Sequence, residues 1–274
     1  NSYMKELPNR RIIDTFLFCN ELDLLDIRLQ ELNPHVDLFI LVEANTTFSG
    51  QSKPYYYELN KERYSEFADK ILHIKIEDMP KYKGPGDLAG EIYQRVAISD
   101  TVHYLNEEGQ LDFDDLIFLS DVDEIPFMSD LMMELEHGVI CPSVLHMDSR
   151  LYYLDRSRDL RWQGTVVCTV RDMIGLGAQS LRDGRFEMNR VWNGWHFSYL
   201  GGFESVSSKL DSLADASVAF EKAGITREEM EENVKQGIDP YGRVLDKPYT
   251  VHDLDLPKYV VENSTLYPEF IYAK

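Results

Sequence analysis

The sequence predicts an α/β fold in which helices flank a mainly parallel central sheet. Apolar runs of the length of a strand recur along the 274 residues, and stretches with a helical stripe separate several of them. The first elements follow the order strand, helix, strand, strand, and further helical segments lie between the later strands. Strands of a parallel sheet are buried on both faces and are therefore continuous apolar runs, and their alternation with helices is typical of this class.

The first part of the chain supplies three of the strands and one helix. Residues 12–19 (IIDTFLFC) and 38–42 (LFILV) are apolar and rich in β-branched or aromatic side chains, as expected of buried strands. Between them, residues 22–32 carry four leucines at helical spacing, which predicts an amphipathic helix. Residues 71–76 (ILHIKI) alternate between apolar and polar side chains and predict a third strand.

Later segments continue this alternation. A loop rich in Gly, Pro and Lys over 81–90 precedes a helix expected over 91–105, and residues 116–119 (LIFL) predict a fourth buried strand. Two more strands, an aromatic segment and an acidic helix are expected at 143–154, 165–170, 192–199 and 223–234. The sequence contains no internal repeat and no low-complexity segment.

The chain is strongly acidic, with a formal net charge of −20 from 28 Lys and Arg against 48 Asp and Glu. Such a surface repels phosphate backbones and anionic lipids, so we expect no nucleic-acid partner and no binding to a membrane surface. A bound divalent cation reverses the local sign, so a small anionic ligand stays compatible with this charge. The sequence has no run of about 18 apolar residues, which predicts no membrane span in this chain.

Three cysteines, Cys19, Cys141 and Cys168, have no CxxC spacing, and this favours buried thiols over a disulfide framework or a thiolate zinc site. The first residue is Asn1, which is consistent with a removed N-terminal segment or with a tag remnant before Met4. The compartment is therefore open: the chain is either a cytoplasmic protein or the lumenal part of a trimmed, membrane-anchored one.

The strongest local signal is the segment LIFLSDVDEIP, in which a buried strand runs directly into Asp121 and Asp123. In open α/β sheets, ligands bind beyond the carboxyl ends of the strands. Carboxylate oxygens suit Mg²⁺ or Mn²⁺ ions, which also bind the phosphates of a substrate. Alternate residues of a strand share a face, so both side chains can reach one ion. This context favours a metal-bound diphosphate over the alternative, a solvated turn rich in Asp.

Five segments in order along the chain resemble glycosyltransferase family 17. They are FLFCNELDLLDIRLQEL (16–32), DLFILVEANTTFSGQSKP (37–54), EIYQR (91–95), DLIFLSDVDEIP (115–126) and NGWHFSYLGG (193–202). The resemblance implies a GT-A type fold, a UDP-linked N-acetylglucosamine donor, a divalent metal and an inverting transfer to a carbohydrate acceptor. It also implies one domain over residues 1–274, with the donor nucleotide and metal held by about 10–126 and the acceptor by about 127–274. Residues after Gly202 match less clearly, which leaves the acceptor open.

The resemblance implies a metal site built around the two aspartates. Asp121 and Asp123, with Ser120 beside them, are expected to join an Mn²⁺ or Mg²⁺ ion to the diphosphate of a UDP-sugar, where the ion assists the departure of UDP. His196 lies between two aromatic residues and matches a family segment, so it is a third candidate ligand. Its alternative role is a hydrogen-bonded histidine of the core.

Residues at the ends of the first two strands are expected to meet the nucleoside. Asn20 and Glu21 follow the first strand and are placed to contact the base and ribose, and capping of the next helix is a compatible role. Glu43 ends the second strand on the same rim and is expected to face the uridine or the sugar.

Two arginines are candidate contacts for the diphosphate. Arg28 is expected either at the pyrophosphate or in an ordinary ion pair with Asp23 or Glu31 of its own helix. Arg95 is expected near the donor pocket, or in a surface salt bridge with Glu91 one helical turn earlier.

Inversion requires a base that accepts the proton of the attacking hydroxyl, and a carboxylate serves this role in inverting glycosidases. Glu204, just after Gly201, is the first candidate, and Glu124, next to the metal motif, is the second. The alternative for Glu124 is an ion pair that orients its neighbours. Trp162 is one of several aromatic residues that suit either stacking on a sugar or packing in the core.

Two other functions remain open from the sequence. A strand that ends in DxD also marks phosphohydrolases of the haloacid dehalogenase class, but there the motif lies near the N-terminus, whereas here it lies beyond position 115 and Glu124 follows it. A carbohydrate-binding protein without catalytic activity, on a degenerate transferase fold, is the second alternative. The intact pair of aspartates argues against it.

Overall fold

The computed structural model describes residues 10–201, 203–212, 224–242, 249–250 and 255–272. One mixed sheet runs through this part of the chain in the order β3-β2-β1-β4-β7-β6-β8-β5, with β9 paired to β7. The strands are β1 (Ile12–Phe18), β2 (Leu38–Ala44), β3 (Ile71–Ile76), β4 (Leu116–Asp121), β5 (Glu124–Ile125), β6 (Ser143–Leu151), β7 (Arg156–Thr169), β8 (Asn189–Ser198) and β9 (Tyr249–Thr250). The expected α/β fold is confirmed.

The parallel part of the sheet is its first half. β1 runs parallel to β2 and β4, and β2 runs parallel to β3. Beyond β4 the sheet is mixed, because β7 pairs antiparallel with β4 and β6, whereas β6 and β8 are parallel. The carboxyl ends of β1, β2 and β4 therefore meet at one edge, where ligands bind in open α/β sheets.

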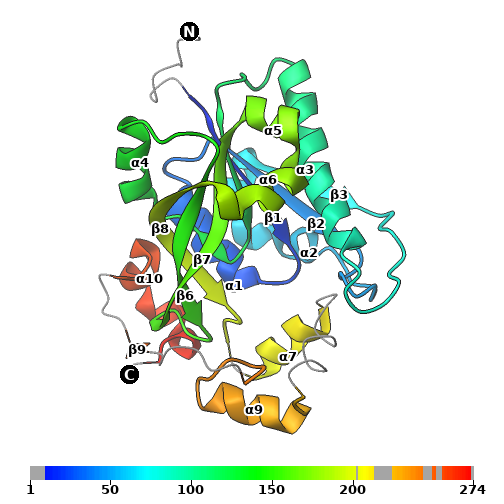
Figure 1. Cartoon of the computed structure of the whole chain (residues 1–274), viewed down its shortest axis with the longest axis vertical. Coiled ribbons are helices and arrows are strands. Elements are labelled where there is room, and N and C mark those ends of the chain that lie inside the picture. Colours follow the sequence, from blue (N-terminus) through cyan, green and yellow to red (C-terminus); the bar gives the residue numbers. More distant parts are fainter. Residues whose placement is uncertain (1–9, 202, 213–223, 243–248, 251–254, 273–274) are drawn as a thin grey trace.

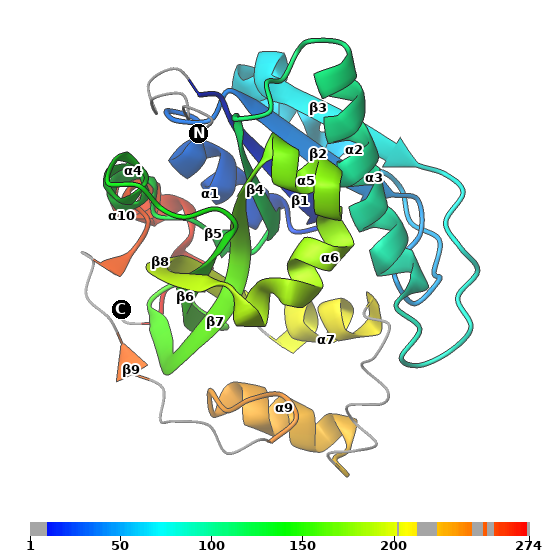
Figure 2. The ribbon, with the colours of Figure 1, turned by 45° about the horizontal axis from the view of Figure 1, so that its top comes forward.

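Helices cover both faces of the sheet (Figures 1 and 2). The side chains of α1 (Leu22–Leu32), α4 (Met128–Glu136) and α10 (Lys258–Glu262) pack into one apolar cluster with one face of the strands. Those of α3 (Ala89–Glu107), α5 (Val170–Leu176) and α6 (Ala178–Asp183) pack into a second cluster on the other face.

The side chains of β1 point alternately to the two faces of the sheet, so this one strand contributes to both apolar clusters. Phe16 and Phe18 belong to the cluster under α1, whereas Ile13 and Leu17 belong to the cluster under α3. Successive side chains of a strand point to opposite faces, so a continuous apolar run is what a strand between two helical layers needs.

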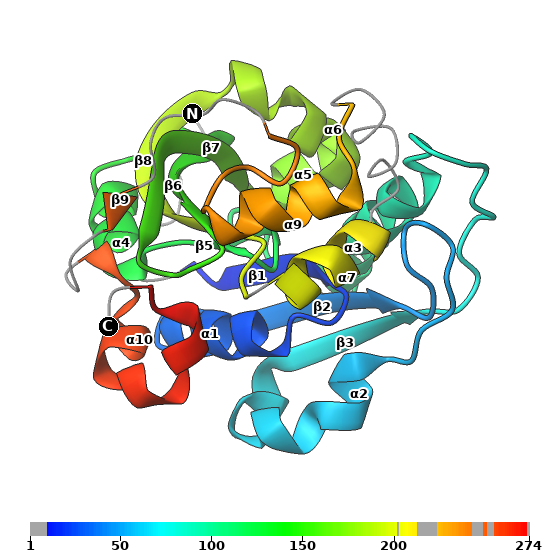
Figure 3. The same cartoon turned by 90° about the horizontal axis from the view of Figure 1, so that it is seen from below.

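The remaining elements lie at the edges of this sandwich. They are α2 (Tyr56–Asn60), η2 (Lys61–Lys70), η3 (Gly184–Glu187), α7 (Phe203–Ser212), α9 (Arg227–Lys235), η5 (Ser264–Leu266) and η6 (Pro268–Phe270). Figures 1 and 3 show α7 and α9 together at one end of the sheet, where Val206, Met230 and Val234 form a small cluster with the end of β6. No helix within the described ranges is long and apolar enough to cross a membrane.

The C-terminal segment closes the cluster under α1. The backbone N–H of Tyr259 donates to Glu31 Oε1 at 2.5 Å, and the Tyr267 hydroxyl donates to Asp26 Oδ2 at 3.1 Å. Val260 is fully buried in the same cluster. The last described residues are thus part of the main core and not an appendage.

Candidate functional site

A cavity of about 350 Å³ opens where β1 and β4 end. Segments after β1 and β2, the start of α3, the end of β4, and α6 and α7 form its walls. Five cationic and five carboxylate side chains line it: Lys53, Arg95, Arg182, Arg185, Lys209, Glu21, Glu91, Asp121, Asp123 and Asp183. In a chain with a net charge of −20, five cations at one cavity are a local concentration of positive charge, and Arg185 among them donates to the backbone carbonyls of Gln163 and Arg182, so this lining suits an anionic ligand.

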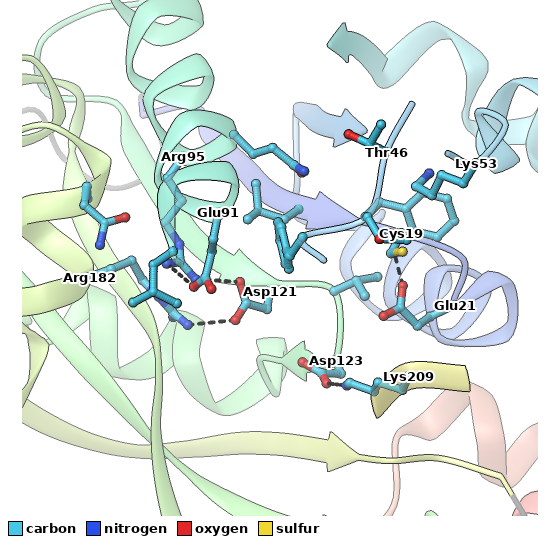
Figure 4. Close-up of a pocket in the computed structure, with 18 of the residues that line it drawn as sticks. Cys19, Glu21, Thr46, Lys53, Glu91, Arg95, Asp121, Asp123, Arg182 and Lys209 are labelled. Atoms are coloured by element: carbon cyan, nitrogen blue, oxygen red, sulfur yellow. Dashed lines mark hydrogen bonds and ion pairs between the residues drawn. The ribbon is translucent and has the colours of Figure 1, made fainter. Parts of the chain in front are cut away.

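Asp121 is the last residue of β4, and its carboxylate lies between two guanidinium groups (Figure 4). Arg95 Nη2 lies 3.3 Å from Oδ1, and Arg182 Nη2 lies 3.0 Å from Oδ2. Burial raises the pKa of this carboxyl, but the charges of Arg182 and Arg95 outweigh that effect and hold the pKa well below its ordinary value. Asp121 is therefore ionised at neutral pH.

Asp123 lies two residues further on and has different partners. Lys209 Nζ, from α7, lies 2.6 Å from Oδ2, and His196 Nε2 lies 3.7 Å from Oδ1. Burial raises the pKa of the carboxyl, and the charge of Lys209 outweighs it, so the net shift is downward. The cavity thus receives two ionised carboxylates from one short turn (Figure 4).

The chemistry of this pair fits a hard divalent cation only together with a substrate. No group of three or more His, Cys, Asp or Glu side chains with the spacing of a metal site occurs among the described residues. Mg²⁺ is commonly held by one or two carboxylates plus substrate phosphates and water, so two aspartates are a sufficient protein contribution. Such an ion would compete with Lys209 for Asp123, because the ammonium group occupies one of its oxygens.

Glu124 does not face the cavity and is unsuited to act as the base. Its carboxylate is fully buried and forms a bidentate ion pair with Arg182, with Nη1–Oε2 and Nη2–Oε1 distances of 2.9 Å. The Trp162 indole N–H and the backbone N–H of Asp121 also donate to it, at 2.7 and 3.1 Å. The prediction of Glu124 as a base is wrong, because no lone pair is left for a substrate, and the ion-pair alternative is correct.

Arg28 is also buried, and it binds the backbone of the turn at residues 121–124. It does not line the cavity in which a diphosphate would lie. Its guanidinium forms a bidentate ion pair with Asp14 of β1, at 2.8 and 2.6 Å, with both side chains fully buried. Its Nη1 donates to the carbonyls of Asp121 and Glu124, at 3.2 and 2.5 Å. The expected partners Asp23 and Glu31 are wrong, because Arg28 points inward from α1 toward the strand beneath it.

Asn20 and Glu21 lie where the sequence predicted, at the rim after β1. Asn20 is exposed, and Glu21 Oε2 accepts the backbone N–H groups of Cys19 and Asn20 at 3.2 and 3.0 Å. Glu21 lines the first cavity and also a neighbouring second cavity of about 420 Å³, which Asn20 lines as well. Contact with a nucleoside stays a prediction for both.

Glu43 and Ser120 are buried and line neither cavity. Glu43 accepts the backbone N–H of Tyr56 at 2.5 Å and holds the Lys53 ammonium group at 3.1 Å, so it orients a cation of the cavity wall. Ser120 hydrogen-bonds with Thr165 Oγ1 of β7 at 2.7 Å, and both hydroxyls are buried. Direct donor contact by Glu43 and Ser120 is therefore not supported.

His196 does not line the cavity, but it lies next to two residues that do, Asp123 and Trp162. Its ring stacks on Trp162 with centroids 4.7 Å apart, and its Nδ1 is a buried atom without a hydrogen-bond partner. Burial lowers the pKa of the imidazole although Asp123 is near, so the ring is neutral, as a metal ligand must be. Its role as a ligand stays a prediction. The side chain of Glu204 lies outside the described part of the structure.

Sequence reasoning missed most of the cationic lining. Lys53 lies in a loop, Arg182 in the six-residue helix α6 and Lys209 in α7, and no local motif surrounds the last two. Arg182 and Lys209 meet the aspartates across 61 and 86 residues of sequence. Arg95 lines the cavity and pairs with both Glu91 and Asp121, and its contact with a donor stays a prediction.

Comparison with known proteins identifies the family of this chain. The family model for Glycosyltransferase family 17 matches residues 2–254. The chain is similar to the protein named Beta-1,4-mannosyl-glycoprotein 4-beta-N-acetylglucosaminyltransferase in Rattus norvegicus, Homo sapiens and Mus musculus, with 30% identity over 152 residues in each case. These residues are 54% of this chain and 28% of each relative, so the match spans under a third of the relatives' length.

Among solved structures, the chain is similar to 4-diphosphocytidyl-2C-methyl-D-erythritol synthase. The TM-score is 0.41 and the sequence identity is 11%, over 68% of this chain and 90% of that chain.

Proposed function

The chain belongs to glycosyltransferase family 17, and from that premise we propose that it transfers N-acetylglucosamine from UDP-GlcNAc to a carbohydrate acceptor, with inversion and with the help of a divalent metal. The donor sugar follows from the names of the similar rat, human and mouse proteins, which are N-acetylglucosaminyltransferases. Those names also specify a β-1,4-mannosyl glycoprotein as acceptor, and a β-mannosyl sugar is accordingly the acceptor to test first.

The observation that carries this proposal is that two ionised aspartates lie together with five cationic side chains in the lining of one cavity at the end of β4. A nucleotide-sugar presents a diphosphate, whose charge a divalent ion and fixed cationic side chains can both stabilise. Arg95 and Arg182 provide fixed charge on one side of the turn, and Lys209 provides it on the other.

In the proposed reaction, the acceptor hydroxyl attacks the anomeric carbon from the face opposite to UDP. The bond from this carbon to the phosphate oxygen breaks, its electrons leave with UDP, and the hydroxyl proton passes to a base. Asp121 and Asp123 would hold the ion, which supplies Lewis-acid stabilisation of the charge that develops on UDP. Arg182 stabilises the same charge without reorganisation, because Glu124 already holds its guanidinium in place. Lys209 adds its positive charge once the ion has taken its place at Asp123.

For the base we retain Glu204, on α7, the helix that also brings Lys209 to the cavity. The phosphohydrolase alternative loses its support, because a transferase family matches residues 2–254. A binding protein without activity remains the second candidate, and the same experiment separates the two.

Calorimetric titration with UDP, with and without Mn²⁺, tests donor binding, and UDP release from UDP-GlcNAc tests turnover. Asp123→Asn should abolish the Mn²⁺-dependent part of UDP binding and leave the fold intact. Asp183→Asn is the matched control, because Asp183 lines the same cavity and its hydrogen bond is with Gln179. Undiminished UDP binding by Asp123→Asn would contradict the metal site. Binding of UDP-GlcNAc without any UDP release would favour the non-catalytic alternative.

A further inference from the structure

The second cavity, of about 420 Å³, lies against the first and is bounded by the start of α1, by η2, by the end of β8, by α7 and by η6. Its volume is in the range of ligand-binding pockets. Glu21 and Lys209 line both cavities and form the wall between them. We propose that this second cavity binds the acceptor of the transfer, as a neutral, hydroxyl-rich sugar, and this proposal rests on the proposed function.

Adjacency is the first argument. A transferase must hold the attacking hydroxyl within about 3–3.5 Å of the anomeric carbon, so the donor and acceptor sites have to adjoin. Among the described residues, Glu21 and Lys209 are common to the two cavities: Lys209 contacts Asp123 directly, and Glu21 follows the neighbouring strand β1.

The pairing of charges in the lining is the second argument. Its two cations already have carboxylate partners: Arg63 Nη2 lies 2.5 Å from Asp23 Oδ1 and 3.1 Å from Asp26 Oδ2, and Lys209 Nζ lies 2.6 Å from Asp123 Oδ2. Glu21 adds a further carboxylate to the lining, so the second cavity has no excess of positive charge for an anionic ligand, and this favours a neutral one.

The uncharged part of the lining suits a sugar. Ser205 and Ser208 of α7 are exposed hydroxyls that can pair with ligand hydroxyls. Tyr199 and Phe270 supply aromatic surface, and the Tyr199 phenol adds a polar tip. Sugars present apolar C–H faces with hydroxyls at the edge, so a pocket with both kinds of surface matches them.

The backbone at Tyr199 is the third argument. Its φ is 53°, in the left-handed region, which is unfavourable for a non-glycine residue and persists only where surrounding structure enforces it. The outlier lies directly after β8 and places the Tyr199 ring 5.5 Å from Lys209 Nζ. Such strain gathers at ligand sites, and here it fixes an aromatic ring at the junction of the two cavities.

Filling the second cavity without touching the first tests the proposal. Ser208→Trp places a bulky ring into the second cavity, which Ser208 lines, whereas it does not line the first. Ser65→Trp is the matched control, since Ser65 is exposed on η2 and lines neither cavity. Saturation-transfer NMR in the presence of UDP measures binding of methyl β-D-mannoside, methyl β-D-glucoside and methyl β-D-glucuronide, and calorimetry measures binding of UDP.

In the unmodified chain, the two neutral glycosides should give the stronger signals, with the glucuronide weaker than the glucoside that differs from it only in the carboxylate. Ser208→Trp should reduce the signal of the neutral glycosides about tenfold or more while UDP still binds, and Ser65→Trp should change neither. Undiminished glycoside signals in Ser208→Trp, a parallel loss of UDP binding, or no binding of any neutral glycoside to the unmodified chain would each overturn the acceptor site. Failure of the unmodified chain to bind UDP would instead refute the proposed function.

Discussion

The change of Arg28 to Met tests how the turn that carries Asp121 and Asp123 is held. Arg28 is fully buried and forms a bidentate pair with Asp14, and its Nη1 group donates to backbone carbonyls of the turn. Met fills most of the volume of the Arg stem, so the substitution removes charge and hydrogen bonds more than packing.

The expected loss of unfolding free energy is about 4 kcal/mol, because removing one partner of a buried ion pair costs about 3–5 kcal/mol. The cost arises from Asp14, which stays buried without a counter-charge. The double variant Asp14→Leu with Arg28→Met should recover most of this loss, since replacing both charges by apolar groups is often neutral. Lys61→Met is the control for loss of an exposed cation and should change stability little, because its pair with Glu58 lies at the surface.

The deficit of Arg28→Met should also depend on pH. Burial raises the pKa of the Asp14 carboxyl, and the charge of Arg28 offsets part of that rise. Without Arg28, the folded-state pKa rises further above the unfolded value. The folded state then binds more protons than the unfolded state, so the stability of the variant should increase relative to the parent as pH falls from 7 toward about 4.

Urea unfolding followed by tryptophan fluorescence, at several pH values, measures these differences. The reasoning about the buried pair fails if Arg28→Met loses less than about 1 kcal/mol, a value typical of surface pairs. It also fails if the double variant is no more stable than the single one, or if the deficit grows as pH is lowered.

Three further outcomes are expected. Gly194→Ala should destabilise the fold by about 2–4 kcal/mol in urea unfolding, because the φ of Gly194 is 79° and an added Cβ would lie 2.5 Å from the carbonyl oxygen of Ile125; an unchanged midpoint would contradict this. His196→Ala should weaken Mn²⁺ affinity about tenfold or more in calorimetry done with UDP, while thermal unfolding stays cooperative; loss of the fold would support a purely structural histidine. Arg182→Lys should lower UDP affinity about tenfold, since an ammonium group cannot hold Glu124 with two parallel bonds, and equal affinities would refute that role.

Elements with a complete local pattern were predictable from the sequence. The helix over 22–32 and the strand over 71–76 have the predicted bounds, because their apolar periodicity reports the packing directly. The short helix α5 was missed, and residues 165–170 were assigned to a strand alone. A signal was present there, since Thr169 and Asp172 form a capping box that starts a helix immediately after β7.

Only the part of the site that lies within a single segment of sequence could be predicted. The motif with Asp121 and Asp123 follows a buried strand, and that order places it at the edge of the sheet. The partners Arg182 and Lys209 come from distant segments, and only the tertiary fold brings them together. Arg28 was misassigned for a related reason: helical spacing offers acids within its own helix, whereas its actual partner lies on the strand beneath.

The closure of the core by the last described residues has a consequence for how the chain is made. Tyr259 pairs with Glu31 across 228 positions of sequence, so one side of α1 has no cover until the segment around Tyr259 has been synthesised. At about 5–20 residues per second, roughly 10–50 s pass between the synthesis of these two partners. During that interval an apolar helix face is open to other nascent chains, and we therefore expect this side of the molecule to be where chaperones engage it.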